Sequence, residues 1–353
     1  MKKKKNVDYK KNIDKNSVVK KRLLLMVSFF LITYFFQNQL YATQVVAFYN
    51  CENFYDTTNQ IKVIDEEFLP GSQKQYTSEA YSIKSKLLAK VIYGMGKMDN
   101  SNGIAILGLV EIENKWVLEK LIAEPILQKY HYKYLHFDSK DQRGIDVALI
   151  YNPAYFIPYQ YRPYSLTDAN HFNDYATRDI LYVKGRLDGE WVHILVNHWP
   201  SRRGGAFLSN GKRIWAASVC KKIMDSVAKI DPQAKFIVMG DFNDNPNNAS
   251  IKKLALLNPF LALFKKGYGS LAFRDSWSLF DQILLSRHWG QSNNNLTNYK
   301  PIIYTIPDMI ETQGKYQGYP KRTYDGDRFR GGYSDHFPVA LIFKPILSGN
   351  TLK

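Results

Sequence analysis

The chain has 353 residues, of which 45% are hydrophobic and 23% charged, values that exclude a disordered chain and allow a full core. Its length permits one large domain or two ordinary ones. Half of the formal net charge of +16 lies in the first 22 residues, which hold ten Lys or Arg and two Asp; the remainder keeps +8. That remainder is still compatible with a polyanionic partner.

Residues 1–42 have the pattern of an export signal. A Lys-rich region covers residues 1–22, and the apolar segment 23–36 is too short to span a bilayer comfortably. Ala42 supplies a small residue at the −1 position of a cleavage site. We expect a periplasmic or secreted protein without stable membrane contact after cleavage; an uncleaved membrane anchor is the alternative.

The first half of the mature chain contains three apolar strand patterns, each with a polar residue at one end. Asn50 ends the first strand, Glu111 directly follows the second, and Arg143 enters the third. A carboxylate such as Glu111 at the end of a fully apolar strand is costly unless it is paired or bound to a cation. Asn50 could simply terminate its ladder, and Arg143 could be a structural salt-bridge partner. The three strands span residues 44–50, 104–110 and 143–151.

Helices are predicted wherever apolar residues recur with helical spacing. The first is capped by Thr77 or Ser78, and the second is capped by Asn114. Cys51 and Cys220 fall in a predicted strand and helix, where thiols are more often small buried hydrophobes than disulfide partners. The helices cover residues 77–92, 114–122, 213–227 and 250–257.

Two strands in the middle, residues 180–187 and 191–196, form a hairpin through Asp188-Gly189. Arg178 comes just before the hairpin, and Asn197 and His198 come just after it. A lone His in a loop is usually only a surface residue. At a strand end, beside Asn197 and a Gly-rich loop with two arginines, His198 is a better candidate for a site.

The stretch KFIVMGDFNDNP, residues 235–246, is the centre of the interpretation. A buried strand ends at Gly240 and is followed by Asp241 and Asn243. Such a strand places polar groups rigidly at the rim of a sheet, where α/β proteins keep their chemistry. An Asp/Asn-rich turn that caps the next helix is the alternative.

The last third contains two further strands and a long loop. A strand over residues 280–286 has Asp281 near its start, and Asp335 and His336 precede a final strand that ends near residue 343. Residues 290–332 have no usable period and are predicted to be loop. We find no repeat and no linker, and therefore expect one domain over residues 44–345, followed by a tail, 346–353.

The polar residues at the strand ends describe one chemistry. Oxygen ligands without Cys or clustered His suit Mg²⁺, Mn²⁺ or Ca²⁺ rather than zinc. Arginines and amides suit phosphate oxygens, and a His–Asp pair supplies an oriented proton acceptor. Together these residues indicate metal-assisted attack of water on a phosphate ester. The residues are Asn50, Glu111, Arg143, Arg178, Asn197, His198, Asp241, Asn243, Asp281, Asp335 and His336.

Seven blocks in order resemble the endonuclease/exonuclease/phosphatase superfamily. They are N-C-E-N-F-Y-D, L-V-E-I-E-N, R-G-I-D-V-A-L-I-Y, N-H-W-P-S-R, M-G-D-F-N-D, F-D-Q-I-L-L-S and G-Y-S-D-H-F-P-V, within about residues 44 to 345. The resemblance implies an α/β fold, a four-layer sandwich in which two mostly antiparallel sheets face each other, with helices outside and the site at one edge.

The resemblance also implies roles for individual residues. Glu111 would be the main Mg²⁺ ligand, helped by Asn50 and by Asp335 through water. Asp241 would orient or deprotonate the attacking water, with Asn243 on the scissile phosphate. His336, paired with Asp281, would bind that phosphate or act as base. His198 would donate a proton to the leaving oxygen, and Arg178 would hold phosphate, with Arg143 less certain.

The leading hypothesis for the substrate is DNA, with RNA also considered, cleaved by an exported and monomeric endonuclease. It is supported by the charge of +8 and by basic residues interleaved with aromatics within residues 316–330, although a solvated basic loop is the alternative. A phosphodiesterase or phosphatase for a lipid head group or small ester is the second hypothesis. A non-catalytic binding protein on the same scaffold is the third.

Overall fold

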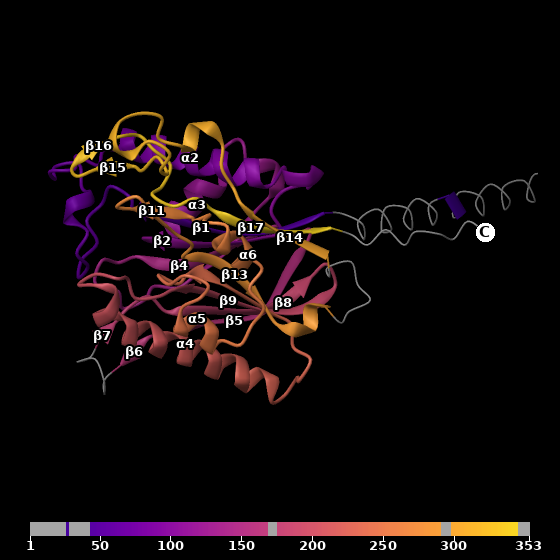
Figure 1. The fold of residues 1–353 in the computed structure, drawn as a ribbon. Coiled ribbons are helices and arrows are strands. Elements are labelled where there is room, and N and C mark those ends of the chain that lie inside the picture. Colours follow the sequence, from indigo (N-terminus) through magenta and orange to yellow (C-terminus); the bar gives the residue numbers. More distant parts are fainter. Residues whose placement is uncertain (1–25, 28–42, 169–174, 291–297, 345–353) are drawn as a thin grey trace, which may run out of the picture.

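The computed structural model describes residues 26–27, 43–168, 175–290 and 298–344. The predicted signal peptide, apart from residues 26–27, and the predicted tail lie outside these residues. Figure 1 shows two sheets stacked face to face, with α2 and α3 on one outer side and α4 and α5 on the other. The predicted four-layer α/β sandwich is therefore confirmed.

The six-stranded sheet has the order β14-β17-β1-β2-β4-β3. Neighbouring strands are antiparallel except β1 and β2, which are parallel. The strands are β1 (Gln44–Phe54), β2 (Ile106–Ile112), β3 (Lys133–His136), β4 (Asp146–Tyr151), β14 (Asn298–Ile303) and β17 (Val339–Lys344).

The five-stranded sheet has the order β13-β10-β9-β8-β5. Here again one pair, β9 with β10, is parallel and the others are antiparallel. The strands are β5 (Phe156–Tyr164), β8 (Ile180–Leu187), β9 (Glu190–His198), β10 (Phe236–Asp241) and β13 (Asp281–Leu285). Smaller ladders pair β6 (Thr167–Asp168) with β7 (Tyr175–Ala176), β11 (Leu271–Phe273) with β12 (Ser276–Ser278), and β15 (Tyr324–Asp325) with β16 (Arg328–Phe329).

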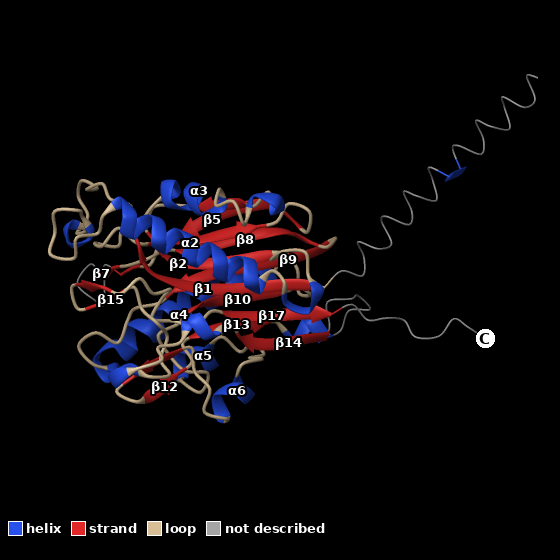
Figure 2. Cartoon of the chain, turned by 90° about the horizontal axis from the view of Figure 1, so that it is seen from above, coloured by secondary structure: helices blue, strands red, loops and turns tan. Residues whose placement is uncertain are grey.

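Three apolar layers hold the sandwich together, because both sheets are buried on both faces. The inner faces meet in a cluster that includes Phe48, Val110, Ile194 and Met239. A second cluster packs α2 (Ser78–Met95) and α3 (Lys115–Ile122) on the six-stranded sheet, and Figure 2 shows these helices over its strands. A third packs α4 (Ala206–Ala228) and α5 (Ala249–Lys253) on the other sheet; α6 (Leu261–Lys265) is a short surface helix.

The predicted helix caps are confirmed at both positions. The Thr77 side chain accepts a hydrogen bond from Ala80 N at the start of α2, and Asn114 accepts bonds from the first turn of α3. Cys51 and Cys220 are free, buried thiols that pack in different apolar clusters on opposite outer sides. Among the described residues, none of the helices combines the length and the hydropathy needed to cross a membrane.

The prediction of an unbroken loop over residues 290–332 is wrong in part, because β14 and β16 lie within that range. β14 contains Pro301 and β5 contains Pro158 and Pro163, so neither reads as a strand in the sequence. Both lie at the edge of a sheet, where a proline does not remove a ladder hydrogen bond that a neighbour needs. The rest of residues 304–338 forms a loop built from short 3-10 turns and the β15–β16 ladder.

The two parallel pairs bring the predicted site residues together. Parallel strands end at the same edge of a sheet, so β1 and β2 present Asn50 and Glu111 at one edge. β9 and β10 present His198 and Asp241, which are directly paired in register, at the facing edge. The site therefore lies where the ends of both sheets meet.

Candidate active site

Glu111 is aimed into the site by a β-bulge at the end of β2. The register between β2 and β4 shifts between Val110 and Ile112, and Glu111 itself has a left-handed backbone with φ 61°. Its Oε2 atom accepts a hydrogen bond from Asn53 N at 2.8 Å. The other carboxylate oxygen, Oε1, lies 3.9 Å from His198 Nε2 and faces the space between the sheets.

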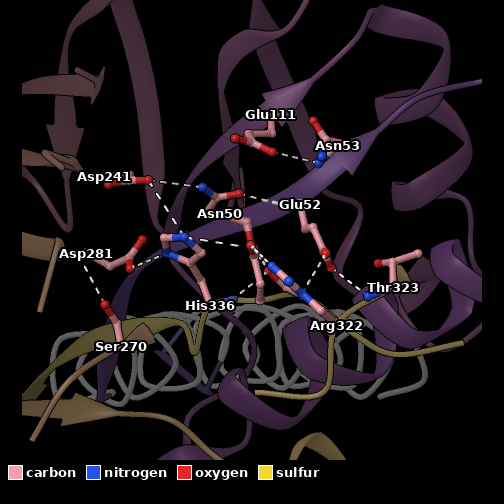
Figure 3. Close-up of polar contacts among 12 residues, drawn as sticks. Asn50, Glu52, Asn53, Glu111, Asp241, Ser270, Asp281, Arg322, Thr323 and His336 are labelled. Atoms are coloured by element: carbon pink, nitrogen blue, oxygen red, sulfur yellow. Dashed lines mark hydrogen bonds and ion pairs between the residues drawn. The ribbon is translucent and has the colours of Figure 1, made fainter. Parts of the chain in front are cut away.

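Figure 3 shows Asp241 joined to Asn50 and His336. Asp241 Oδ1 accepts a bond from Asn243 N at 2.9 Å, and Asp241 Oδ2 accepts one from Asn50 Nδ2 at 3.1 Å. Burial, and then the neighbouring charge of Asp281, raises the pKa of Asp241 to about 7. A raised pKa makes this carboxylate a stronger base, which suits a group that takes a proton from water.

His336 and Asp281 form the closest ion pair of this cluster. His336 Nδ1 lies 2.7 Å from Asp281 Oδ2, and His336 Nε2 lies 4.0 Å from Asp241 Oδ2. Burial alone would lower the pKa of His336, but attraction by Asp281, Asp335 and Asp241 outweighs it and raises this pKa well above its ordinary value. His336 is accordingly a cation at neutral pH.

His198 is the neutral counterpart of His336. Its Nε2 lies 3.7 Å from Asp241 Oδ2, and its Nδ1 has no hydrogen-bond partner among the described residues. Burial, followed by repulsion from Arg178, Arg143 and His336, lowers the pKa of His198 well below its ordinary value. An anion bound beside it would raise that pKa again.

Arg178, just before β8, and Arg143, in the turn before β4, reach the same region and share Asp141. Arg178 Nη1 lies 3.1 Å from Asp141 Oδ2, and its Nη2 donates to Trp199 O at 2.8 Å. Arg143 Nε lies 3.5 Å from Asp141 Oδ1, and its side chain is 40% exposed. Arg178 is thus buried and fixed, whereas the Arg143 guanidinium is still open to a ligand.

Asn243 joins the cluster, whereas Asn197 does not. Asn243 has a left-handed backbone, and its Nδ2 donates to Trp199 O at 3.0 Å. Asn197 is fully buried: its amide nitrogen donates to Leu195 O and Met239 O, and its oxygen accepts from Trp199 Nε1. We expected Asn197 to contact substrate, but its hydrogen-bonding groups hold the backbone beneath the site instead.

Glu52 is a further carboxylate near Asp335, and the sequence does not identify it as a site residue. Asp335 Oδ2 accepts from Arg322 Nη2 at 2.8 Å, and Arg322 Nε lies 3.7 Å from Glu52 Oε1. Lys84, buried in α2, donates to Glu52 O at 3.0 Å and to Tyr333 O at 3.1 Å, and it also contacts Thr323 Oγ1. The only sequence signal was the position of Glu52 two residues after Asn50, which was assigned to a polar turn.

The donor set fits a divalent metal ion of the kind that prefers oxygen ligands. Asp241, Asp281 and His336 lie close enough to share an ion, and Asp281 Oδ1 is buried without a hydrogen-bond partner among the described residues. A cation would relieve the repulsion between these carboxylates. The residues expected to hold the ion, Glu111, Asn50 and Asp335, border this group. Asn50 Nδ2 donates to Asp241 Oδ2, and Asp335 Oδ1 lies 3.9 Å from His336 Nε2. Glu111 Oε1 faces the same space, 3.9 Å from His198 Nε2.

Another possible metal-binding group lies away from this cluster. His136 Nε2 is 3.2 Å from Asp146 Oδ2 and His136 Nδ1 is 3.8 Å from Asp138 Oδ1. Asp138 is largely exposed, and Asp146 also accepts a bond from Ser139 N at 2.8 Å. These contacts join the end of β3 to the start of β4.

Residues 45–344 match a family model described as the Endonuclease/Exonuclease/phosphatase family. The chain belongs to this family. The match spans both sheets and every site residue described above, so the resemblance seen in the sequence is confirmed. No curated protein matches the chain.

Solved structures with the same fold share little sequence with the chain. Truncated TDP2 from Caenorhabditis elegans is 14% identical with a TM-score of 0.53, covering 86% of this chain and 98% of that one. The human Nocturnin catalytic domain with bound sulfate is 15% identical with a TM-score of 0.52, covering 86% and 94%. A mannosyl-6-phosphatase from Bacteroides thetaiotaomicron is 15% identical with a TM-score of 0.50, covering 84% and 98%.

Endonuclease/exonuclease/phosphatase enzymes hydrolyse phosphate esters and generally depend on a divalent metal. Family membership and the cluster of Asp241, Asp281 and His336 make the chain a phosphoester hydrolase. Neighbours below 25% identity establish the fold alone, so the substrate has to be argued from the site.

Proposed function

We propose that the chain is a divalent-metal-dependent phosphodiesterase that cleaves nucleic acid internally, with DNA as the first substrate and RNA as the second. The observation that carries the proposal is the convergence of the His336–Asp281 pair, 2.7 Å apart, with Asp241 and the bulged Glu111 at one sheet edge. The net charge of +8 on residues 23–353 supports a polyanionic substrate.

The residues then have distinct roles in the reaction. Asp241, held by Asn50 and Asn243, orients the attacking water and takes its proton. The His336 cation binds a non-bridging phosphate oxygen, and Asp281 keeps it charged. A divalent ion at Glu111, Asn50 and Asp335, with Mg²⁺ as the first choice and Mn²⁺ or Ca²⁺ as alternatives, would stabilise the charge that develops on the phosphate and the leaving oxygen.

We assign His198, on the five-stranded sheet, to the leaving oxygen. His198 is neutral without substrate, and the negative phosphate raises its pKa, so that it can donate a proton to the departing oxygen. The exposed guanidinium of Arg143 contacts phosphate, and the buried Arg178 holds Trp199 O and so places the segment after His198. We further propose that the enzyme acts as an exported monomer in the periplasm or outside the cell.

A small phosphate ester is the second candidate, and one observation favours it. Arg322 and Arg330, which the sequence suggested as nucleic-acid contacts, are paired with Asp335 and Glu311 at 2.8 and 3.3 Å. Their charges are therefore partly compensated. One protein with a similar fold is a mannosyl-6-phosphatase, which is consistent with a sugar phosphate as an alternative substrate.

Supercoiled plasmid distinguishes these candidates. The full chain should nick plasmid with Mg²⁺ and not with a chelator, and Asp241→Asn should lower the rate at least about a thousandfold, as expected for loss of a general base and its positioning. The matched control is Asp225→Asn, because Asp225 is an exposed carboxylate on α4 that pairs with Lys221 one turn away. Intact plasmid with Mg²⁺, Mn²⁺ and Ca²⁺ would reject the nuclease and leave the small ester.

A further inference from the structure

A cavity of about 600 Å³ lies directly beside the catalytic cluster. One wall is the turn Ala272–Asp275 between β11 and β12, and the other is the loop from Glu311 to Arg330. Asp335, next to His336 in the chain, lines the cavity together with its partner Arg322. We call it the loop pocket, and nothing in the reaction described above uses it.

The walls of the loop pocket are fixed to each other and to the catalytic segment. The Tyr319 hydroxyl donates to Asp275 Oδ1 at 2.7 Å and accepts from Asp275 N at 2.6 Å, which joins the two walls. Trp277 stacks on Phe337, the residue after His336, with ring centroids 6.0 Å apart. These contacts fix the shape of the pocket and its position relative to the residues that bind the phosphate.

The lining of the pocket has equal numbers of basic and acidic side chains and includes two exposed aromatic rings. Four basic side chains and four carboxylates line the pocket, and two of the basic ones are ion-paired. A chain of phosphates would gain little from such a lining. Phe273 is 67% exposed on one wall and Tyr316 is 37% exposed on the other. Arg274 lies over one face of Phe273 and Lys315 over one face of Tyr316, so a ligand would stack on the remaining exposed part of each ring.

We propose that the loop pocket binds one unpaired nucleobase of the nucleotide attached to the scissile phosphate. Stacking on Phe273 and Tyr316 would hold the base, and the carboxylates and guanidiniums would hydrogen-bond its polar edge. The inference rests on the proposed action on nucleic acid and deepens it. A base that is stacked and paired inside a duplex cannot insert between Phe273 and Tyr316, so the enzyme prefers single strands and unpaired ends.

Matched oligonucleotides test this preference. With the full chain and Mg²⁺, kcat/KM should be higher for a single strand than for the same sequence in a duplex. The preference is the kcat/KM for the single strand divided by that for the duplex. Tyr316→Ala and Phe273→Ala should each lower this ratio about tenfold, the loss expected for one base–aromatic stack. Tyr268→Ala should leave the ratio unchanged, because Tyr268 is exposed but lies outside the pocket. Equal cleavage of both forms, or ratios that do not change, would overturn the proposal.

A binding measurement separates the pocket from the reaction. Asp241→Asn protein with Mg²⁺ should bind thymidine 5′-monophosphate in calorimetry, and adding Tyr316→Ala should weaken that binding about tenfold. This result would stand even if no nucleic acid is cleaved, in which case only the proposed function fails. Absence of binding, or binding of glucose 6-phosphate in its place, would reject the assignment to a nucleobase.

Discussion

Three residues at the site adopt backbone conformations that side-chain-bearing residues rarely take. Glu111, Glu52 and Asn243 have φ values of 61°, 50° and 51°. Such conformations cost on the order of 1 kcal/mol or more each and persist only where the surroundings enforce them. Here they turn the side chain of Glu111 toward His198, that of Glu52 toward Thr323 and Lys84, and that of Asn243 toward Trp199 O.

His193 is a buried histidine whose role is structural, and it gives the chain a pH-dependent stability. Its Nδ1 lies 2.7 Å from the Tyr182 hydroxyl, and its ring packs on Phe236. Burial, followed by repulsion from Lys184 and opposed by attraction to Asp231, lowers the pKa of His193 to about 4. Between about pH 6.5 and pH 4, His193 therefore binds a proton in the unfolded chain but not in the folded one.

We expect His193→Gln to remove part of the acid sensitivity of the fold. The contribution of His193 is fully present above pH 6.5 and is lost as the pH falls toward 4, by about 2 kcal/mol once partial screening by solvent is allowed for. Melting temperatures of both proteins between pH 7.5 and 4 measure the difference. Curves that stay parallel over this range would contradict the assignment.

At the scale of elements, Lys84 shows how α2 fixes the loop that borders the site. Its ammonium group lies under Glu52, Thr323 and Tyr333, and so joins the helix, the end of β1 and the loop before His336. Burial lowers the pKa of Lys84 despite its acidic neighbour. The hydrogen bonds that the Lys84 ammonium group donates also hold Thr323 beside Glu52.

Lys84→Met should destabilise the fold by about 3 kcal/mol, because it removes one partner of a buried ion pair and takes a donor from the carbonyl oxygens of Glu52 and Tyr333. Lys86→Met on the same helix is the control: Lys86 is exposed, and its replacement should change stability by less than about 0.5 kcal/mol. Urea unfolding measures both. A loss at Lys84 no larger than that at Lys86 would show that this ammonium does not hold the loop.

The same elements show what could be predicted from the sequence and what could not. Asn50, Glu111, Asp241 and His336 can be predicted because each follows or precedes an apolar strand. Parallel pairing brings the ends of β1 and β2, and of β9 and β10, together, and antiparallel pairing places the start of β17 beside the end of β1. Lys84 was missed because a lysine in a Lys-rich helix looks solvent-exposed until the loop that covers it is known.

The edge strands and the pocket were missed for related reasons. β5 and β14 contain prolines, which weaken a strand pattern although an edge tolerates them. The loop pocket depends on contacts between Asp275 and Tyr319, 44 positions apart, which no local pattern encodes. The basic and aromatic residues of the loop are visible in the sequence, but their pairing with Glu311, earlier in the loop, and with Asp335, beyond it, is not.

At the scale of the whole molecule, the distribution of charge decides how strongly a nucleic acid is attracted. Residues 23–353 carry +8, yet Arg322 and Arg330 beside the site are ion-paired. The paired cations cannot release counterions from a phosphate chain as free ones would. Attraction to substrate should therefore be general and moderate, with few direct phosphate contacts.

We expect kcat/KM on a single-stranded oligonucleotide to fall about sevenfold between 50 and 200 mM NaCl. This estimate corresponds to about two phosphates neutralised on a single strand, where the slope is roughly −0.7 for each. Bis(p-nitrophenyl) phosphate, which carries one charge, is the control and should lose less than about twofold. A loss near a hundredfold on the oligonucleotide would show that the paired arginines contact phosphate after all. Equal salt dependence for both substrates would contradict electrostatic binding of a polyanion and favour the small phosphate ester.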